Sequence, residues 1–196
     1  MTFAELLAEV YLITNRPDLI NQTKSAIKAA TLKMHGIDFF SKDIYETGVD
    51  LESEALIHSW DYVTLIPNFR SFSYVNRLID SADTNGVPIN ILTPTDLLDE
   101  YGATKPNIAY VAGRSLEMRS QVAFRYLTIG VYVYPVVTEL NYVSWIADQF
   151  PYAIIYEAAS KIWRSVGGAE EARLQDINSK EIQFQIITSA STNVGF

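Results

Sequence analysis

The spacing of apolar residues changes twice along the chain, from a helical period to a strand period and back again. Apolar positions recur with helical spacing over about 3–34 and 151–187, whereas residues 57–66 and 124–137 alternate as strands do. Helices at the two ends of a chain share one core only if the middle leaves that core and returns to it. We therefore expect an α+β fold, a helical bundle formed by the N- and C-terminal helices with a β-rich insertion in the middle.

The expected organisation is a discontinuous helical core of residues 1–40 and 144–190, a β-rich insertion of residues 41–143, and a C-terminal arm of residues 188–196. Of the 196 residues, 48% are hydrophobic, so the chain can bury enough apolar surface to offset the entropy lost on folding. We expect one globular domain with a large insertion, not two independent domains.

Local signals mark the ends of the N-terminal helices. Thr2 and Glu5 have the spacing of a capping box, which predicts a helix over Phe3–Thr14. Pro17 suits the first turn of a second helix, and Gly36 would end it. The run MTFAELLAEV has no basic stretch before its apolar residues, so it does not resemble a secretory signal.

The C-terminal segment predicts a helical hairpin. Pro151 suits the first turn of its first helix, and Glu157 and Lys161 have the favourable order for an ion pair one helical turn apart. Gly167–Gly168 is expected to end this helix, and the next helix is expected to run to about Ile187.

The middle of the chain predicts antiparallel strands. The run IHSWDYVTLIP alternates, with Trp60 and Tyr62 on one side, and FRSFSYVNRLI is its expected hairpin partner. After a short helix near Thr95–Tyr101, NIAYVAG and SLEMRSQ are expected to form a hairpin that turns at Gly113–Arg114. The run FRYLTIGVYVYPVV is apolar on both sides, so we expect both sides to be covered; it is too short to cross a membrane, and no membrane partner is expected.

No combination of residues indicates catalysis. His35 and His58 each precede an acid by three residues, Asp38 and Asp61, but two ligands do not make a metal site, and we interpret both as surface or helix-end histidines. Nucleophile-elbow, phosphate-loop and dinucleotide fingerprints are absent, and the chain has no cysteine. The sequence therefore predicts no enzyme, no cofactor and no metal ion.

The net charge and the aromatic content of the chain limit the kinds of partner that it is expected to bind. A formal net charge of −8 disfavours a protein that holds nucleic acid by neutralising phosphates. The basic cluster Lys24, Lys28 and Lys33 is interpreted as a solvated face, with contact to an acidic partner or passing DNA as the alternative. The 12 tyrosines and three tryptophans fit core packing, a subunit interface or, as a third alternative, carbohydrate binding. The candidate interface residues are Trp60, Tyr132, Tyr134, Val194 and Phe196.

Several segments follow one another in an order that points to a family. They are TPTDLLDEYG, NIAYVAGRSLEMRS, a β stretch ending in YPVVT, and SWIADQFPYAIIYEAASKIWRSVGGAEEA, preceded by TFAELLAEVYLITNRPDLI near the start. In this order and spacing the chain resembles, over nearly its whole length, the head-to-tail adaptor (connector) proteins of tailed bacteriophages, especially the short-tailed ones. The matching positions of the core helix are Trp145, Pro151, Ala153, Ile154, Ala158 and Ala159.

The resemblance implies a structural virion protein without catalytic residues. It implies a ring, commonly a dodecamer, that docks beneath the portal protein, carries the tail nozzle or tail tubular protein, and continues the DNA channel without binding the genomic DNA specifically. It places the protein at the head–tail junction of the virion, after assembly in the host cytoplasm. The C-terminal arm, Thr188–Phe196 here, would reach into the portal.

Two alternatives from other classes remain open at this stage. One is a tail-associated host-receptor or carbohydrate-binding module that uses exposed aromatic residues, and the other is a hydrolase with an unrecognised site. For the core helix, burial of Trp163 would make its replacement by alanine cost about 3 to 5 kcal/mol.

Overall fold

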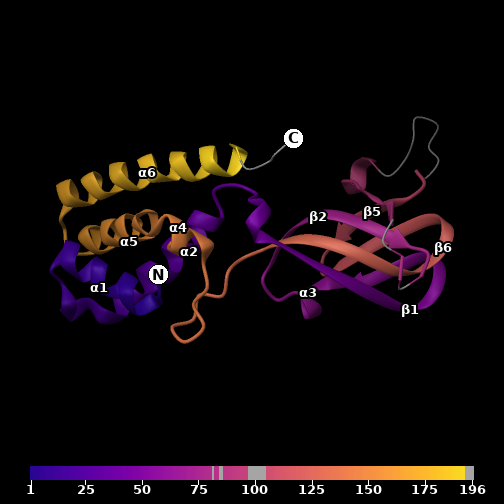
Figure 1. Ribbon diagram of the computed structural model, residues 1–196, viewed down its shortest axis with the longest axis horizontal. Helices are drawn as coiled ribbons and strands as arrows, with labels where there is room; N and C mark the ends of the chain where they lie inside the picture. The colour runs from indigo at the N-terminus through magenta and orange to yellow at the C-terminus, as the bar shows by residue number, and fades with distance from the viewer. Residues whose placement is uncertain (81, 84–85, 97–104, 193–196) are drawn as a thin grey trace. The chain divides into compact units, whose positions relative to one another are not determined.

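The computed structural model describes residues 1–80, 82–83, 86–96 and 105–192. The chain forms two compact units, a helical unit of Met1–Asp43 with Tyr134–Phe196 and a strand unit of Ile44–Val133 (Figure 1). The predicted α+β class is confirmed, because the N- and C-terminal helices pack together and the middle of the chain forms a nearly closed barrel sheet. The strand unit ends at Val133 and not at residue 143, since the short hairpin that contains the Val137–Tyr142 bridge belongs to the helical unit.

The N-terminal helices begin where the sequence signals place them. Helix α1 spans Phe3–Thr14, the 3-10 helix η1 spans Pro17–Leu19, and α2 spans Ile20–His35. The capping box is present: the backbone N–H of Thr2 donates to Glu5 Oε2 over 2.8 Å, and the N–H of Glu5 donates to Thr2 Oγ1 over 3.3 Å. These two bonds satisfy donors that the first turn of α1 leaves free.

The C-terminal helices are α4 (Trp145–Gln149), α5 (Pro151–Ser165) and α6 (Ala169–Thr192). Helices α5 and α6 form the predicted hairpin. Between them Gly167 has a φ of +85°, which glycine adopts without the strain that a side chain would bring.

Helix α6 is longer than the sequence predicted. It ends at Thr192 instead of near Ile187, and Ala190, beyond the predicted end, packs against the helical core. Within the same turns Thr188 Oγ1 donates to Phe184 O over 2.9 Å, and Ser189 Oγ donates to Ile186 O over 3.0 Å. The predicted arm of residues 188–196 is therefore helical over 188–192, and residues 193–196 lie outside the described part of the chain. No described helix, α6 included, is long and apolar enough to cross a membrane.

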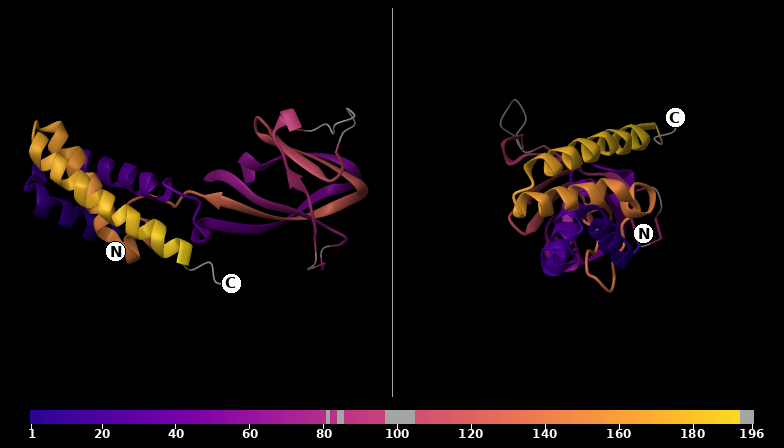
Figure 2. Two further views of the ribbon diagram at one scale, coloured as in Figure 1. Left: turned by 90° about the horizontal axis from the view of Figure 1, so that it is seen from above. Right: turned by 90° about the vertical axis from the view of Figure 1, so that its left-hand side faces the viewer.

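Helix α5 is the central layer of the helical unit, with α1 and α2 on one side and α6 on the other (Figures 1 and 2). Ala153, Ile154, Ile155, Ala158 and Ala159 are all fully buried, as expected for a core helix whose small residues let its neighbours approach closely. The rest of this core comes from the last turn of α5 (Ile162) and from α1, α2, α4, α6 and their flanking residues: Phe3, Leu6, Val10, Ala26, Ile27, Ala30, Met34, Phe40, Ile146, Ala147 and Ile186.

The lysines of α2 pair with acids of their own unit, which corrects their interpretation as a solvated face. Lys24 Nζ lies 2.7 Å and Lys28 Nζ 3.8 Å from the carboxylate of Glu139, and Lys33 Nζ lies 2.6 Å from Glu157. Glu157 is only 6% exposed, and Lys161, its predicted partner one turn on, lies 3.7 Å from its carboxylate. A buried carboxylate needs such partners, because burying an unpaired charge is costly.

The strand unit is built around one long strand, β6 (Ser115–Val133). Along one edge of β6, its first half pairs with β5 (Ile108–Ala112) and its second half with β2 (Phe69–Leu78). Along the other edge, β1 (Ile44–Asp61) pairs with β6 for most of its length. All three pairings are antiparallel. The short strands β3 (Val87–Pro88) and β4 (Asn90–Ile91) pair with β2 and β5.

Two predictions about these strands are wrong. The strand expected over 57–66 ends at Asp61, because the Asp61 carboxylate accepts the N–H groups of Val63 and Thr64 and so caps a short helix, α3 (Tyr62–Leu65). The following strand, β2, is not the hairpin partner of β1 but pairs with β6. The β5–β6 hairpin is confirmed, with Gly113 at a φ of +62° in its turn.

The expected helix near Thr95–Tyr101 is described only at its start, where a 3-10 helix, η3, spans Pro94–Asp96; residues 97–104 lie outside the described part of the chain.

The core of the strand unit includes Trp60, which is 8% exposed. Its other buried members are Val49, Tyr62, Ile66, Val75, Ile89, Ala109, Leu116, Met118, Phe124, Leu127, Ile129 and Val131.

Trp163 is half-buried and not a core residue, which lowers the expected cost of removing it. It packs against the turn after α5, where a Cβ on Gly168 would lie 2.8 Å from Trp163 Cε3. We expect Trp163→Ala to lower the free energy of unfolding by about 1 to 2 kcal/mol, and Ile154→Ala, at a fully buried position, by about 3 to 4 kcal/mol. Urea denaturation of both variants measures the two values. Equal losses would contradict this placement of the two side chains.

Candidate functional site

The most chemically suggestive cluster lies inside the helical unit, where a serine, a histidine and an aspartate are hydrogen-bonded in series. His35 Nδ1 lies 2.8 Å from Asp43 Oδ1, and His35 Nε2 lies 2.9 Å from Ser144 Oγ. His35 ends α2, Asp43 ends the 3-10 helix η2 (Ser41–Asp43), and Ser144 precedes α4. With the proton on Nδ1, the ring donates to the aspartate and accepts from the serine, the same order of bonds as in a hydrolase triad.

Ser144 has a structural role at the start of α4. Its Oγ accepts the backbone N–H of Ala147 over 3.2 Å and so caps α4, and the residue is only 4% exposed. His35 is 1% and Asp43 5% exposed. The small cavity beside Trp145 has a volume of about 20 Å³, which is room for a water molecule but not for a substrate. The cluster therefore joins elements of the helical core.

Trp145 and Tyr142 extend this network. Trp145 Nε1 donates to Asp43 Oδ1 over 2.8 Å, and the hydroxyl groups of Tyr142 and Thr31 lie 2.8 Å apart. Burial raises the pKa of Tyr142 above its usual value, although hydrogen bonds with Thr31 and Ser144 act in the opposite direction. The phenol thus stays neutral inside the unit. Trp145 contributes both to the packing and to this polar network.

The interpretation of the histidines as surface or helix-end residues is wrong in part. His35 does end α2, but it is buried and its acid partner is Asp43, not Asp38. His58 is 7% exposed; its Nε2 lies 2.7 Å from the carbonyl oxygen of Phe124, and the two rings meet edge-on. Among residues 1–80, 82–83, 86–96 and 105–192, no three His, Cys, Asp or Glu side chains gather as metal ligands would.

Asp43 accepts two buried donors, so its removal tests whether this network is structural. We expect Asp43→Ala to lower the free energy of unfolding by about 2 to 4 kcal/mol, since it removes the oxygen that His35 Nδ1 and Trp145 Nε1 share. Asp38→Ala, at an exposed position on the same loop, is the matched control and is expected to change stability by less than about 0.5 kcal/mol. Thermal and urea unfolding measure both. Similar losses of stability in the two variants would contradict a structural role for the network.

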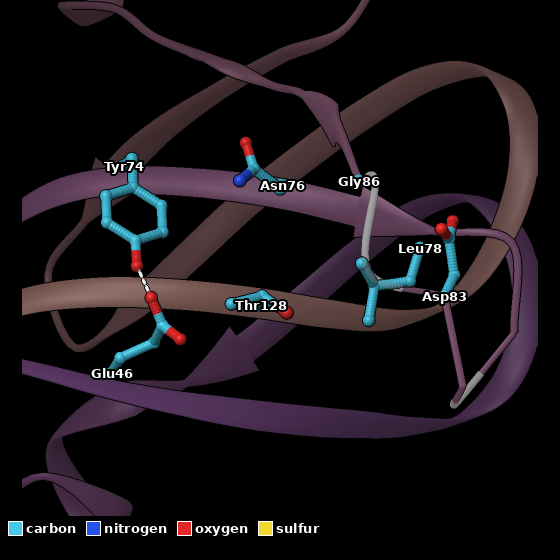
Figure 3. Close-up of a pocket in the computed structure, with 7 residues that line it drawn as sticks. All are labelled: Glu46, Tyr74, Asn76, Leu78, Asp83, Gly86 and Thr128. Carbon is cyan, nitrogen blue, oxygen red and sulfur yellow. Dashed lines mark hydrogen bonds between the residues drawn. The ribbon is translucent and has the colours of Figure 1, made fainter.

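An open groove lies on the strand unit, where side chains from β1, β2 and β6 face the same side of the sheet (Figure 3). Glu46 of β1 and Tyr74 of β2 both pair in register with Gly130 of β6, and Tyr74 reaches across that glycine to hydrogen-bond Glu46. The groove has a volume of about 480 Å³, within the range of small-molecule sites. Its lining is mostly polar: Glu46, Tyr74, Asn76, Leu78, Asp83, Gly86 and Thr128.

The ring of Tyr74 lies flat on the strand beneath it. A Cβ on Gly130 would be 2.2 Å from Tyr74 Cε1 and 2.6 and 2.7 Å from the two carbons bonded to Cε1, the pattern expected when a ring meets the backbone face-on. Any side chain at position 130 would lift this ring. One face of the ring is thus fixed against β6, and the other faces away from the sheet.

The described candidate interface residues lie in different parts of the fold. Trp60 is buried in the strand core, which argues against a role at a subunit surface. Tyr132 is half-buried and lies beside Ile44, at the opposite end of β1 from Trp60. Tyr134 is half-buried in the helical unit, and Val194 and Phe196 lie outside the described residues.

Sequence reasoning missed an exposed apolar surface on α6. Leu174, Ile177 and Phe184 are 56%, 46% and 71% exposed. Their spacing of three and seven residues was available in the sequence, but the sequence analysis assigned no side of this helix. Ala172, Ser179 and Ile186 face the core instead.

No protein-family model matches the chain, and it has no significant match among curated proteins.

Proposed function

We propose that this protein is a head-to-tail adaptor of a tailed bacteriophage, a structural subunit that forms a ring between portal and tail. The observation that carries the proposal is the row of exposed apolar side chains on α6, Leu174, Ile177 and Phe184, on the outer layer of the helical unit. Large apolar side chains that gather on one outer face of a helix favour contact with another protein surface. The order of the segments that resembles these adaptors supports the same role.

Further features of the chain agree with a role in assembly. The Ser144–His35–Asp43 cluster is closed to substrates, which suits a structural protein. The excess of acids, 23 against 15 bases, suits a channel through which genomic DNA passes without being held. In the proposal the ring, commonly a dodecamer in the family, meets the portal on one side and the tail nozzle or tail tubular protein on the other. It is assembled in the host cytoplasm and remains in the virion at the head–tail junction.

The proposal is tested by mixing the purified protein with its cognate portal and imaging the product by electron microscopy. We expect ring-shaped density added to one face of the portal, because the portal supplies a rotationally symmetric surface on which copies can close. Portal particles that carry no additional density at any protein concentration would contradict the proposal.

The groove at Tyr74 favours a second function, binding of a carbohydrate. A pyranose has C–H groups on its faces and hydroxyl groups at its rim, so it suits a flat aromatic ring flanked by hydrogen-bonding side chains. Here Tyr74 supplies the flat ring, and Glu46, Asn76 and Thr128 supply donors and acceptors around it (Figure 3). The two acids of the groove, Glu46 and Asp83, disfavour anionic sugars.

Ligand-observed NMR with glucose, galactose, rhamnose and N-acetylglucosamine tests this second function. We expect weak binding of at least one sugar that is lost in Tyr74→Ala, because the stacking surface is removed. Tyr45→Ala is the matched control, since Tyr45 is 50% exposed on β1 but does not line the groove. Absence of binding by the unmodified protein, or equal binding by Tyr74→Ala, would contradict it.

A further inference from the structure

The helical unit exposes two outer faces on opposite sides of α5. Helix α1 lies on one side of α5 and α6 on the other, so the outward face of each points away from the shared core (Figures 1 and 2). The two faces differ in shape and charge, and together they have the features of complementary contact surfaces.

The α6 face is an apolar stripe bordered by positive charge. Leu174, Ile177 and Phe184 lie about 180° around the helix from the residues that contact α5, at the spacing of the seam of a coiled coil. Arg173 and Lys180, both exposed, border one edge of this stripe. Two exposed acids also lie on this side of α6, Glu170 one heptad before Ile177 and Glu181 between Ile177 and Phe184.

The α1 face is small, apolar and acidic. Leu12 is 77% exposed, and the exposed Ala8 and Ala4 lie about one and two turns before it on the same side. Glu5 and Glu9 accompany them, and Phe3–Thr14 contains no lysine or arginine. The alanines permit another helix to approach closely, while Leu12 projects as an apolar knob.

From these two surfaces we infer that the α1 face of one copy packs on the α6 face of the next copy. Leu12 would insert into the stripe of Leu174, Ile177 and Phe184, and the acids of α1 would meet Arg173 and Lys180. The inference rests on the proposed adaptor function and gives its ring a specific contact. Because the two faces are different and lie on opposite sides of one unit, the contact is head-to-tail, and a head-to-tail contact generates a ring when its rotation closes.

Pairing of α6 with a second α6 is disfavoured by its charges. In an antiparallel pair, the edge that carries Arg173 and Lys180 would face the same edge of the partner helix. In a parallel pair, Glu181 would face its own copy across the seam. Like charges across a contact are destabilising, whereas α1 offers the α6 face an edge of opposite sign.

Substitutions of the two exposed apolar residues test the contact. Leu12→Ser and Phe184→Ser are expected to keep the folded subunit, because both side chains lie in solvent in the isolated chain. Each should weaken ring formation at least about tenfold, measured by native mass spectrometry and electron microscopy with and without the portal. Leu140→Ser is the matched control, since Leu140 is 94% exposed on a hairpin that belongs to neither face.

A charge exchange tests whether these two faces meet each other. Glu9→Lys and Lys180→Glu are each expected to weaken the ring, and the double variant is expected to restore much of it, because the opposite charges are then paired again. Loss in both single variants without recovery in the double variant would overturn the pairing of α1 with α6. Circular dichroism of each variant confirms that the subunit is folded.

The outcomes separate the inference from the function on which it rests. If the unmodified protein forms rings and the Leu12→Ser and Phe184→Ser variants form them equally well, the α1–α6 contact is wrong and the adaptor function stands. If the unmodified protein forms no ring even on the portal, the adaptor function itself fails, and the contact fails with it.

Discussion

The burial of the apolar face of α5 is the constraint on which the helical unit depends. Ile154, Ile155 and Ala158 have no exposed surface, and they are covered by α1 and α2 from one end of the chain and by the other C-terminal helices. An apolar helix of this kind is not stable alone in water, since most helical stability comes from packing of the apolar face. Both ends of the chain must therefore come together before α5 is stable, and the intervening residues fold as a unit of their own.

Local chemistry explains what the sequence predicted well. The capping box at Thr2, the first-turn proline at Pro151 and the left-handed glycine at Gly167 each act within a few residues, so their spacing alone fixes the ends of α1, α5 and their neighbours. The β5–β6 hairpin was predictable for the same reason, because its strands are joined by a short turn at Gly113.

Contacts between distant residues explain what the sequence did not predict. Strand β2 pairs with β6, although β3, β4 and β5 lie between the two in the sequence. No local signal in the sequence distinguishes β6 from β1 as the partner of β2. The cluster of His35, Asp43 and Ser144 is likewise assembled from three separate elements, so its spacing resembles no motif. The stripe on α6 was visible as a pattern, but only the structure shows that this side of the helix faces solvent.

The central claim is that α1, α2 and α5 form one cooperative unit although they come from opposite ends of the chain. Native-state hydrogen exchange of the full chain measures this directly, since it reports the free energy at which each helix opens. The account predicts that the slowest amides of α1, α2 and α5 exchange with one common opening free energy. Exchange of α1 through a separate opening of much lower free energy, while α5 stays protected, would contradict it.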